Sequence, residues 1–206
     1  ASKTRTMDRL FYLVRHGETE WNRAGRMQGQ RDSPLTARGE DQARRVGLAL
    51  AGLIGAGDGF AMVASPLGRA LRTAAIIRAA MGQAADDCPT DDRLMEITWG
   101  AWDGLTRDEI DAGEPGAMAR RLRNHWRFVP PGGGESYAMV AERVRGWLDG
   151  IAQGQRLVVV AHGTTGRVLR GLYAGLGEAE TLALAEPQDA FFRLHGGAIE
   201  RIEAPH

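Results

Sequence analysis

Cysteine, lysine and net charge are what this 206-residue sequence most clearly lacks. Cys88 is the only cysteine, which excludes a disulfide within the chain and a metal site built from several thiolates. Lysine occurs once, at Lys3, so the positive charge is almost all arginine, which we attribute to the base composition of the gene. The 26 basic residues balance 26 acidic ones, so no overall charge attracts nucleic acid or an anionic membrane.

Long apolar runs are also missing. No stretch of about 18 apolar residues occurs, and Ala1–Arg9 is polar, so the sequence predicts neither a membrane span nor a signal peptide. We therefore expect a cytoplasmic protein. A chain of 206 residues can bury one core without disulfides or a metal, and we expect a single domain over residues 1–206.

The stretch Leu10–Asn22 is the feature around which we interpret the rest of the chain. Its first five residues, Leu10–Val14, are apolar without polar alternation, which is typical of a strand buried on both faces of an α/β sheet. Arg15 and His16 follow where that strand ends, and Gly17 allows a sharp turn and a close approach to a ligand. Open α/β sheets bind ligands at the carboxyl ends of their strands, so a cation and an imidazole lie where chemistry is expected.

A second strand end carries the same residue types. The apolar run Leu157–Ala161 is followed by another His-Gly pair, His162-Gly163. Two imidazoles thus end two buried strands, and this repetition favours a shared site over a chance Arg-His-Gly sequence.

A third strand, Phe60–Ala64, leads into a helix. Ser65-Pro66 is typical of an N-cap and first-turn pair, and predicts a helix that runs to about Met81. Arg69 then lies in the first turn, near the positive end of the helix dipole, which is a poor place for a cation unless an anion binds there. Arg69 is therefore a candidate anion-binding residue.

Two further helices and a hairpin complete the pattern. The helices are predicted from apolar residues that recur along one side, and the hairpin from two short strands about a pair of glycines. The predicted elements are a helix from Thr36 to Ile54, a short strand or extended segment over Arg93–Ile97, a helix over Glu135–Ala152, and strands Ala190–His195 and Ala198–Ile202 about Gly196-Gly197.

Glu96 precedes a stretch, Trp99–Gly104, that holds two tryptophans and two glycines. Indoles beside a carboxyl group lower the local polarity and favour the protonated carboxyl, which suits a proton donor. The alternative is that Trp99 and Trp102 are ordinary core residues beside a surface glutamate.

Thr106–Val129 predicts two short helices, the second of them rich in arginine. Most such charged runs are solvated faces. The alternative is a lid that presents some of these side chains to the non-reacting end of an anionic substrate. Pro130–Gly134 predicts a flexible joint that would let a lid move. The charged and aromatic residues in question are Arg120, Arg121, Arg123, His125, Trp126 and Arg127.

These motifs, in this order, resemble those of the histidine phosphatase superfamily, and within it the small phosphoglycerate-mutase-like phosphatases. The resemblance implies a three-layer α/β/α sandwich, with a mostly parallel central sheet, an antiparallel edge strand and a helical lid over residues 99–134. The motifs that carry it are Arg15-His16-Gly17-Glu18-Thr19-Glu20-Trp21-Asn22, Ser65-Pro66-Leu67-Gly68-Arg69-Ala70-Leu71-Arg72-Thr73-Ala74, Glu96 before Trp99-Gly100-Ala101-Trp102-Asp103-Gly104, and His162-Gly163.

The resemblance also implies what the site residues do. His16 would be the nucleophile that forms a phosphohistidine, and Glu96 would donate and accept protons. Arg15, Arg69 and His162 would bind the phosphoryl group, so that neither a metal nor another cofactor is required. The expected substrate-binding residues are Asn22, Gln28, Gly29, Gly163 and Trp99.

The resemblance leaves more than one function open. A phosphatase lets water attack the phosphoenzyme, whereas a phosphoglycerate mutase returns the phosphoryl group to another hydroxyl of the sugar acid. Family mutases that use a bisphosphate primer usually carry extra residues after the equivalent of Glu96, so we expect a phosphatase. A catalytically inert phospholigand-binding or scaffold protein would lack His16, Arg69 or Glu96. A protein phosphohistidine phosphatase would usually be shorter and lack the lid.

The expected partner is a small phosphorylated metabolite, such as a phosphoglycerate, a sugar phosphate or a nucleotide-related monoester. Neither nucleic acid nor a membrane is an expected partner. The edge hairpin permits a homodimer through pairing of sheet edges without requiring one.

Overall fold

The central element of the fold is a sheet of five strands in the order β2-β3-β1-β4-β5. The computed structural model describes residues 9–84 and 88–205. Strand β1 pairs in parallel with β3, and β3 in parallel with β2, while β4 is antiparallel to both β1 and β5. The strands are β1 (Leu10–Arg15), β2 (Ala61–Ala64), β3 (Arg156–Ala161), β4 (Ala190–His195) and β5 (Ala198–Glu203).

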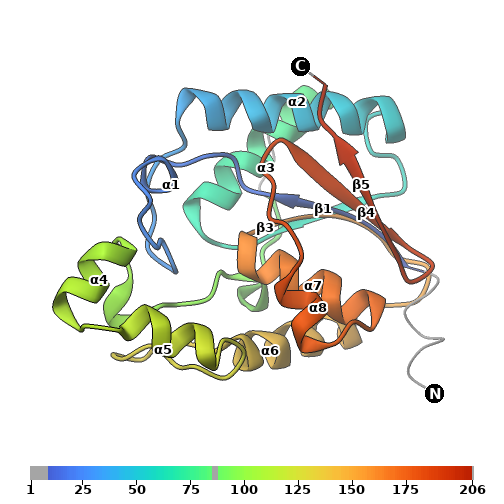
Figure 1. The fold of residues 1–206 in the computed structure, drawn as a ribbon. Helices are drawn as coiled ribbons and strands as arrows, with labels where there is room; N and C mark the ends of the chain where they lie inside the picture. The colour runs from blue at the N-terminus through green and yellow to red at the C-terminus, as the bar shows by residue number, and fades with distance from the viewer. Residues whose placement is uncertain (1–8, 85–87, 206) are drawn as a thin grey trace.

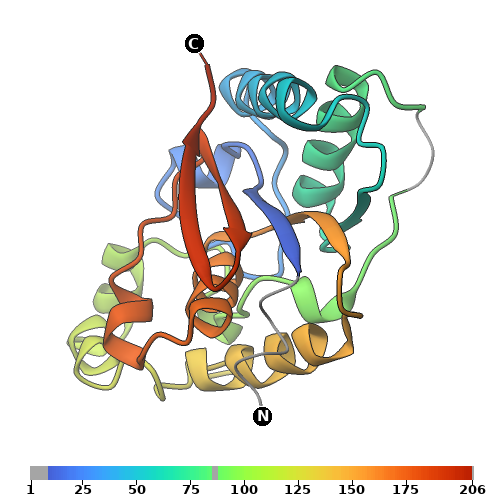
Figure 2. The ribbon, with the colours of Figure 1, turned by 90° about the vertical axis from the view of Figure 1, so that its right-hand side faces the viewer.

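Helices cover both faces of this sheet. On one face lie α2 (Ala37–Ile54) and α3 (Gly68–Ala80), and on the other lie α6 (Tyr137–Gly150) and α7 (Gly163–Ala174), as Figure 1 shows. The hairpin of β4 and β5 runs along one edge of the sheet (Figure 2). The expected three-layer sandwich with a mostly parallel centre and an antiparallel edge is confirmed.

The two core layers follow from the alternation of side chains along the buried strands. In β1, Phe11 and Leu13 join the cluster beneath α6 and α7, whereas Tyr12 and Val14 join the cluster beneath α2 and α3. Strand β3 alternates in the same way between the two clusters. Because both faces are covered, these strands need apolar residues at every position, which is the pattern that predicted them.

Thr36 and Ser136 begin the two long helices that the sequence predicted. The hydroxyl of Thr36 accepts from Gly39 N at 3.0 Å, and that of Ser136 accepts from Met139 N at 3.3 Å, so each satisfies a backbone N–H in the first turn. These N-caps therefore set where α2 and α6 start.

Two predictions need correction. The helix predicted from Ser65 to about Met81 is α3, but it begins at Gly68, and its N-cap residue, Leu67, has no side-chain cap. The segment Arg93–Ile97, predicted as a short strand or an extended segment, forms no strand, and the short 3₁₀ turn η1 (Asp92–Leu94) includes its first two residues. The short helices α1 (Glu20–Arg23) and α8 (Glu178–Leu182) were not predicted.

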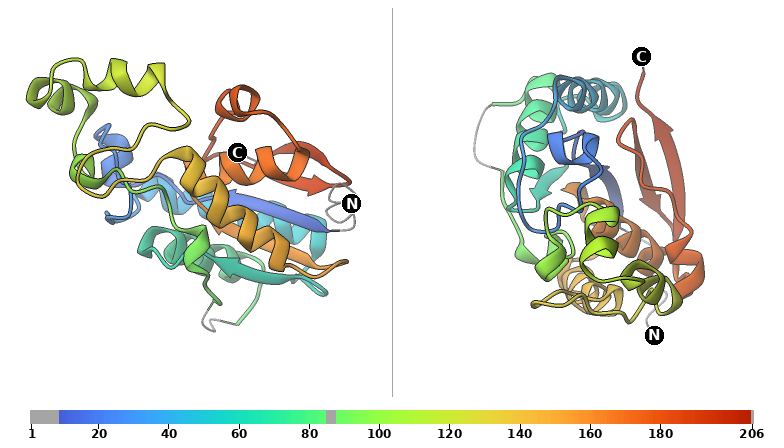
Figure 3. Two further views of the ribbon diagram at one scale, coloured as in Figure 1. Left: turned by 90° about the horizontal axis from the view of Figure 1, so that it is seen from below. Right: turned by 60° about the vertical axis from the view of Figure 1, so that its left-hand side comes forward.

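The segment over residues 99–134, expected to be a lid, stands apart from the sheet (Figure 3, left). It contains the 3₁₀ turn η2 (Gly100–Trp102) and the two predicted short helices, α4 (Arg107–Gly113) and α5 (Ala117–Arg123). Its two ends are joined, because Ala101 N donates to Pro131 O at 2.8 Å. Among the described residues, no helix is long and apolar enough to cross a membrane.

Candidate active site

The two His-Gly strand ends meet at one edge of the sheet. Strands β1 and β3 pair with Arg15 opposite Ala161, so the residues that follow each of them are neighbours. His16 N donates to Ala161 O at 3.0 Å, and the rings of His16 and His162 lie 5.2 Å apart between centroids. The pairing register therefore brings the two imidazoles together, as the sequence predicted.

His16 is held with one ring nitrogen protonated and the other unprotonated. Its Nδ1 lies 2.8 Å from Gly17 O, and a carbonyl can only accept, so Nδ1 carries the proton. Nε2 is then unprotonated, and it accepts from Arg69 Nε at 3.3 Å. Burial, followed by the charges of Arg15 and Arg69, lowers the pKa of His16 well below its ordinary value of 6.5, so the imidazole is neutral.

Arg69 is anchored almost entirely by the loop that precedes α2. Its Nη1 donates to Arg31 O at 2.7 Å and to Asp32 Oδ1 at 2.8 Å, and its Nη2 donates to Gly29 O at 2.6 Å. Asp32 also accepts from Gly68 N at 2.5 Å, so this carboxylate is the anion at the start of α3. The sequence predicted an anion at this place but not that the chain itself supplies one.

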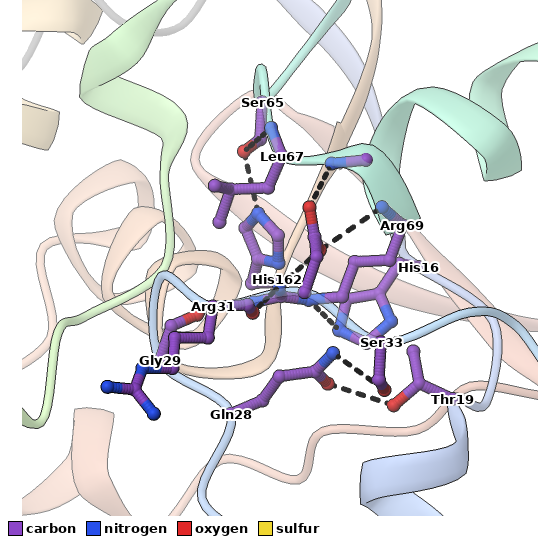
Figure 4. Close-up of polar contacts among 12 residues, drawn as sticks. His16, Thr19, Gln28, Gly29, Arg31, Ser33, Ser65, Leu67, Arg69 and His162 are labelled. Atoms are coloured by element: carbon purple, nitrogen blue, oxygen red, sulfur yellow. Dashed lines mark hydrogen bonds and ion pairs between the residues drawn. The ribbon is translucent and has the colours of Figure 1, made fainter. Parts of the chain in front are cut away.

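His162 presents a second oriented imidazole beside His16. Its Nε2 lies 2.7 Å from Ser65 Oγ, and Ser65 Oγ also accepts from Leu67 N at 3.3 Å (Figure 4). The other ring nitrogen, Nδ1, is buried and has no hydrogen-bond partner among the described residues. Burial, and then the charges of Arg69 and the neighbouring groups, lower the pKa of His162 well below 6.5. Ser65 thus orients His162 instead of capping α3.

Glu96 reaches the first turn of α7 from a loop. Thr164 N donates to its Oε2 at 3.1 Å, while Thr165 N and Thr165 Oγ1 donate to its Oε1 at 3.1 and 3.2 Å. Ile97 N also donates to Oε1, at 2.9 Å. Four donors therefore fix the orientation of the Glu96 carboxyl group beside the start of α7.

The amide side chains expected to bind substrate are already tied to neighbours. Gln28 accepts from Thr19 Oγ1 at 2.8 Å and donates to Ser33 Oγ at 3.1 Å (Figure 4). Asn22 Oδ1 accepts from Gln188 Nε2 at 3.0 Å and from Thr19 N at 3.2 Å. Gly29 takes part through its carbonyl, which accepts from Arg69.

A cavity of about 260 Å³ opens above these residues. Most of the predicted site residues line it together, but His162 and Gly163 line a smaller space that shares Arg15 and Glu186 with it. The predicted residues that line the larger cavity are Arg15, His16, Asn22, Gln28, Gly29, Arg69, Glu96 and Trp99.

One wall of the cavity is a chain of contacts that runs from the strand ends to the 99–134 segment. Arg15 Nη1 donates to Glu186 O, and Glu186 Oε1 lies 3.2 Å from Arg167 Nε. Arg167 Nη1 donates to Tyr137 OH at 3.2 Å. The Tyr137 ring lies 5.1 Å from that of His125, between centroids. Sequence reasoning missed Glu186, Arg167 and Tyr137, because they lie outside the recognised motifs.

The arginines of the 99–134 segment do not all face the same way. Arg120 pairs with Glu114 and Arg127 with Glu178, and both are exposed. Arg121 instead is 6% exposed, and its guanidinium lies 4.6 Å from the centroid of the Trp99 ring. Its Nη2 contacts His125 Nε2 at 2.9 Å, and it has no carboxylate partner among the described residues.

Burial, followed by the charge of Arg121, lowers the pKa of His125 to about 4. His125 is therefore neutral at neutral pH, and the positive charge at this end of the cavity comes from Arg121, Arg107 and Arg167. No group of three or more His, Cys, Asp or Glu side chains within residues 9–84 and 88–205 is arranged to hold a metal ion.

Comparison with known proteins gives consistent matches. Residues 11–193 match the model of the histidine phosphatase superfamily (branch 1). The Salmonella paratyphi C protein named "Probable phosphoglycerate mutase GpmB" is 41% identical over 155 residues, which are 74% of this chain and 68% of that protein.

Two solved structures are similar over nearly the whole chain. Bacillus stearothermophilus YhfR is 30% identical, with a TM-score of 0.75 over 95% of this chain and 96% of that one. A mycobacterial glucosyl-3-phosphoglycerate phosphatase in complex with VO3 is 30% identical, with a TM-score of 0.74 over 96% and 98% of the two chains.

Proposed function

The chain belongs to branch 1 of the histidine phosphatase superfamily, and on this basis we propose that it hydrolyses small phosphomonoesters through a phosphohistidine on His16. The observation that carries the proposal is the state of His16. It is neutral, its Nδ1 is fixed by Gly17 O, and its unprotonated Nε2 accepts from Arg69 Nε. A nucleophile flanked by two guanidinium groups suits attack on a dianionic phosphate.

The proposed reaction has two displacements. In the first, His16 Nε2 attacks phosphorus, the P–O bond to the alcohol breaks, and protonated Glu96 gives its proton to the leaving oxygen. In the second, Glu96 takes a proton from water, the water oxygen attacks phosphorus, and the P–N bond breaks. The products are the alcohol and inorganic phosphate, with His16 neutral and Glu96 protonated again.

We assign binding of the transferred phosphoryl oxygens to Arg15, Arg69 and His162. Arg15 and Arg69 line the cavity next to His16 and supply charged N–H donors. If Ser65 donates its hydroxyl proton to His162 Nε2, then Nδ1 of that ring carries a proton and can donate to the phosphoryl group. His162 Nδ1 is buried and has no hydrogen-bond partner among the described residues, which supports this role.

The other end of the cavity supports a substrate whose leaving group carries a second negative charge. Arg121 is buried without a carboxylate partner among the described residues, and an uncompensated buried guanidinium is costly unless an anion binds it. The names of two similar proteins include phosphoglycerate, which joins a phosphate to a carboxylate. We therefore favour phosphorylated acids of this size as substrates.

Phosphoglycerate mutase activity is the second candidate, because the relative with 41% identity carries that name. The solved structure of a phosphatase, 30% identical over 96% of this chain, supports hydrolysis instead. Both reactions share the phosphohistidine, and they differ only in whether water or a second hydroxyl receives the phosphoryl group.

The test is hydrolysis of an aryl phosphate in the presence of a chelator, with wild type and His16→Ala compared at matched folded concentration. In parallel, phosphoglycerate interconversion is followed with and without a bisphosphate primer. Loss of hydrolysis in the variant, without interconversion in wild type, is the expected result. Primer-dependent interconversion faster than hydrolysis would establish the mutase, and no turnover in either assay would show a catalytically inert protein.

A further inference from the structure

Glu186 is a carboxylate inside the cavity that the proposed reaction does not use. It lies between α8 and β4, and its side chain is 24% exposed. Its Oε1 lies 3.2 Å from Arg167 Nε, and its backbone carbonyl accepts from Arg15. Its Oε2 lies so close to Gly163 that a Cβ there would come within 2.8 Å of it.

The placement of Glu186 links the phosphoryl end of the cavity to the leaving-group end. Arg15, on one side, belongs to the proposed phosphoryl site, and Arg167, on the other, donates to Tyr137 OH at 3.2 Å. Burial raises the pKa of Glu186 above its ordinary value, and the charges of Arg167 and Arg15 limit that shift. Among the described residues, Glu186 and Glu96 are the two acidic side chains that line the cavity, against five arginines.

Arg167 is therefore not a free cation for a ligand. A second phosphate that took donors from Arg167 would have to approach Glu186, since both anions would share one guanidinium. A dianion meets twice the repulsion from Glu186 that a carboxylate meets at the same distance. A leaving group with one negative charge can use Arg121 alone.

We propose that Glu186 is a specificity residue that excludes bisphosphates and selects monophosphates whose leaving group carries at most one negative charge. The inference rests on the function proposed above and concerns the leaving-group end of the same site. Because a primer-dependent mutase must bind a bisphosphate, the same carboxylate favours hydrolysis over mutase activity.

The test measures binding by calorimetry in a His16→Ala background, which prevents turnover of the ligands. Inorganic phosphate, 3-phosphoglycerate and 2,3-bisphosphoglycerate are titrated into chains with Glu186, Glu186→Gln or Glu186→Ala. Glu200→Gln, on the exposed face of β5, is the matched control. Removing the charge should tighten binding of the bisphosphate by roughly tenfold and that of phosphate by less than about threefold, by Coulomb's law at a partly screened distance. Glu200→Gln should change neither.

Other outcomes overturn the inference in distinguishable ways. Equal tightening for all three ligands would place the effect at Arg15 and not at the leaving group. Unchanged or weaker binding in both Glu186 variants would mean that Glu186 only holds its arginine partners. If inorganic phosphate binds none of the chains, the phosphatase proposal fails, and this inference fails with it. Glu186→Ala removes the same charge without leaving an amide to pair, so a folding defect in one variant still leaves the other to decide.

Discussion

The carboxylate of Asp32 contacts Arg69 and the start of α3 at the same time. Its Oδ1 lies 2.8 Å from Arg69 Nη1, and its Oδ2 accepts from Gly68 N at 2.5 Å. The Arg69 side chain is 1% exposed, while that of Asp32 is 38% exposed. A loop residue at the surface therefore both caps a helix and fixes a buried guanidinium beside the nucleophile.

Replacing Asp32 with alanine should weaken both the helix cap and the site. Loss of an N-terminal cap costs about 1 kcal/mol, so the free energy of unfolding by urea should fall by about that amount or somewhat more. Arg69 would lose one of its anchors, and kcat/KM for an aryl phosphate should fall by roughly tenfold. A variant with unchanged stability and unchanged kcat/KM would show that Asp32 has neither role.

Replacing Glu96 with glutamine should slow the reaction in a way that depends on the leaving group. General acid catalysis contributes roughly 10²- to 10⁴-fold when the leaving alcohol is a poor one. An aryl leaving group departs without a proton, so its first displacement should be much less affected. The measurement is kcat/KM of wild type and Glu96→Gln for an aryl and an alkyl phosphate. Equal losses for both would contradict the proton-donor role.

Arg121 and its neighbour Arg120 offer a matched pair for the leaving-group end. Arg121 faces the cavity, whereas Arg120 pairs with Glu114 at the surface. Arg121→Gln should lower kcat/KM for 3-phosphoglycerate by roughly 10- to 100-fold relative to that for an aryl phosphate, through loss of a charge-assisted contact. Arg120→Gln should leave the ratio unchanged. A similar shift in both variants would argue for a general charge effect.

The buried histidines should make the protein less stable in acid. The pKa of His162 is lowered well below 6.5 in the folded chain, so the unfolded chain binds its proton first as the pH falls. Above about pH 6.5, His162 is neutral in both the folded and the unfolded chain. Below that pH, the free energy of unfolding falls by about 1.4 kcal/mol per pH unit, because only the unfolded chain binds the proton. Between about pH 7.5 and about pH 5, the free energy of unfolding measured with urea should fall more steeply for wild type than for His162→Gln. Equal losses of stability in wild type and His162→Gln would contradict a buried, neutral His162.

The sequence predicted the parts of the site that lie on regular elements. Leu10–Val14 and Leu157–Ala161 are apolar at every position because their strands are covered on both faces, so their ends could be located without the structure. His16 and His162 follow these ends directly. Parallel pairing then requires that the two imidazoles lie side by side.

The contacts between distant loops could not be predicted in the same way. Ser65 has the sequence signature of an N-cap, yet its hydroxyl contacts His162, and Asp32 takes the capping role from 36 residues away. Thr165 holds Glu96 from 69 positions along the chain. Such contacts depend on how loops pack above the sheet, and periodicity carries no information on that packing.

The most direct test of a phosphohistidine on His16 is the intact mass of the chain after a rapid alkaline quench during the first turnover of an aryl phosphate. Wild type should gain one phosphoryl group, acid should remove it, as expected of a phosphohistidine, and His16→Ala should gain none. A phosphoryl group on the His16→Ala chain, or undiminished hydrolysis by that variant, would contradict the central role of His16.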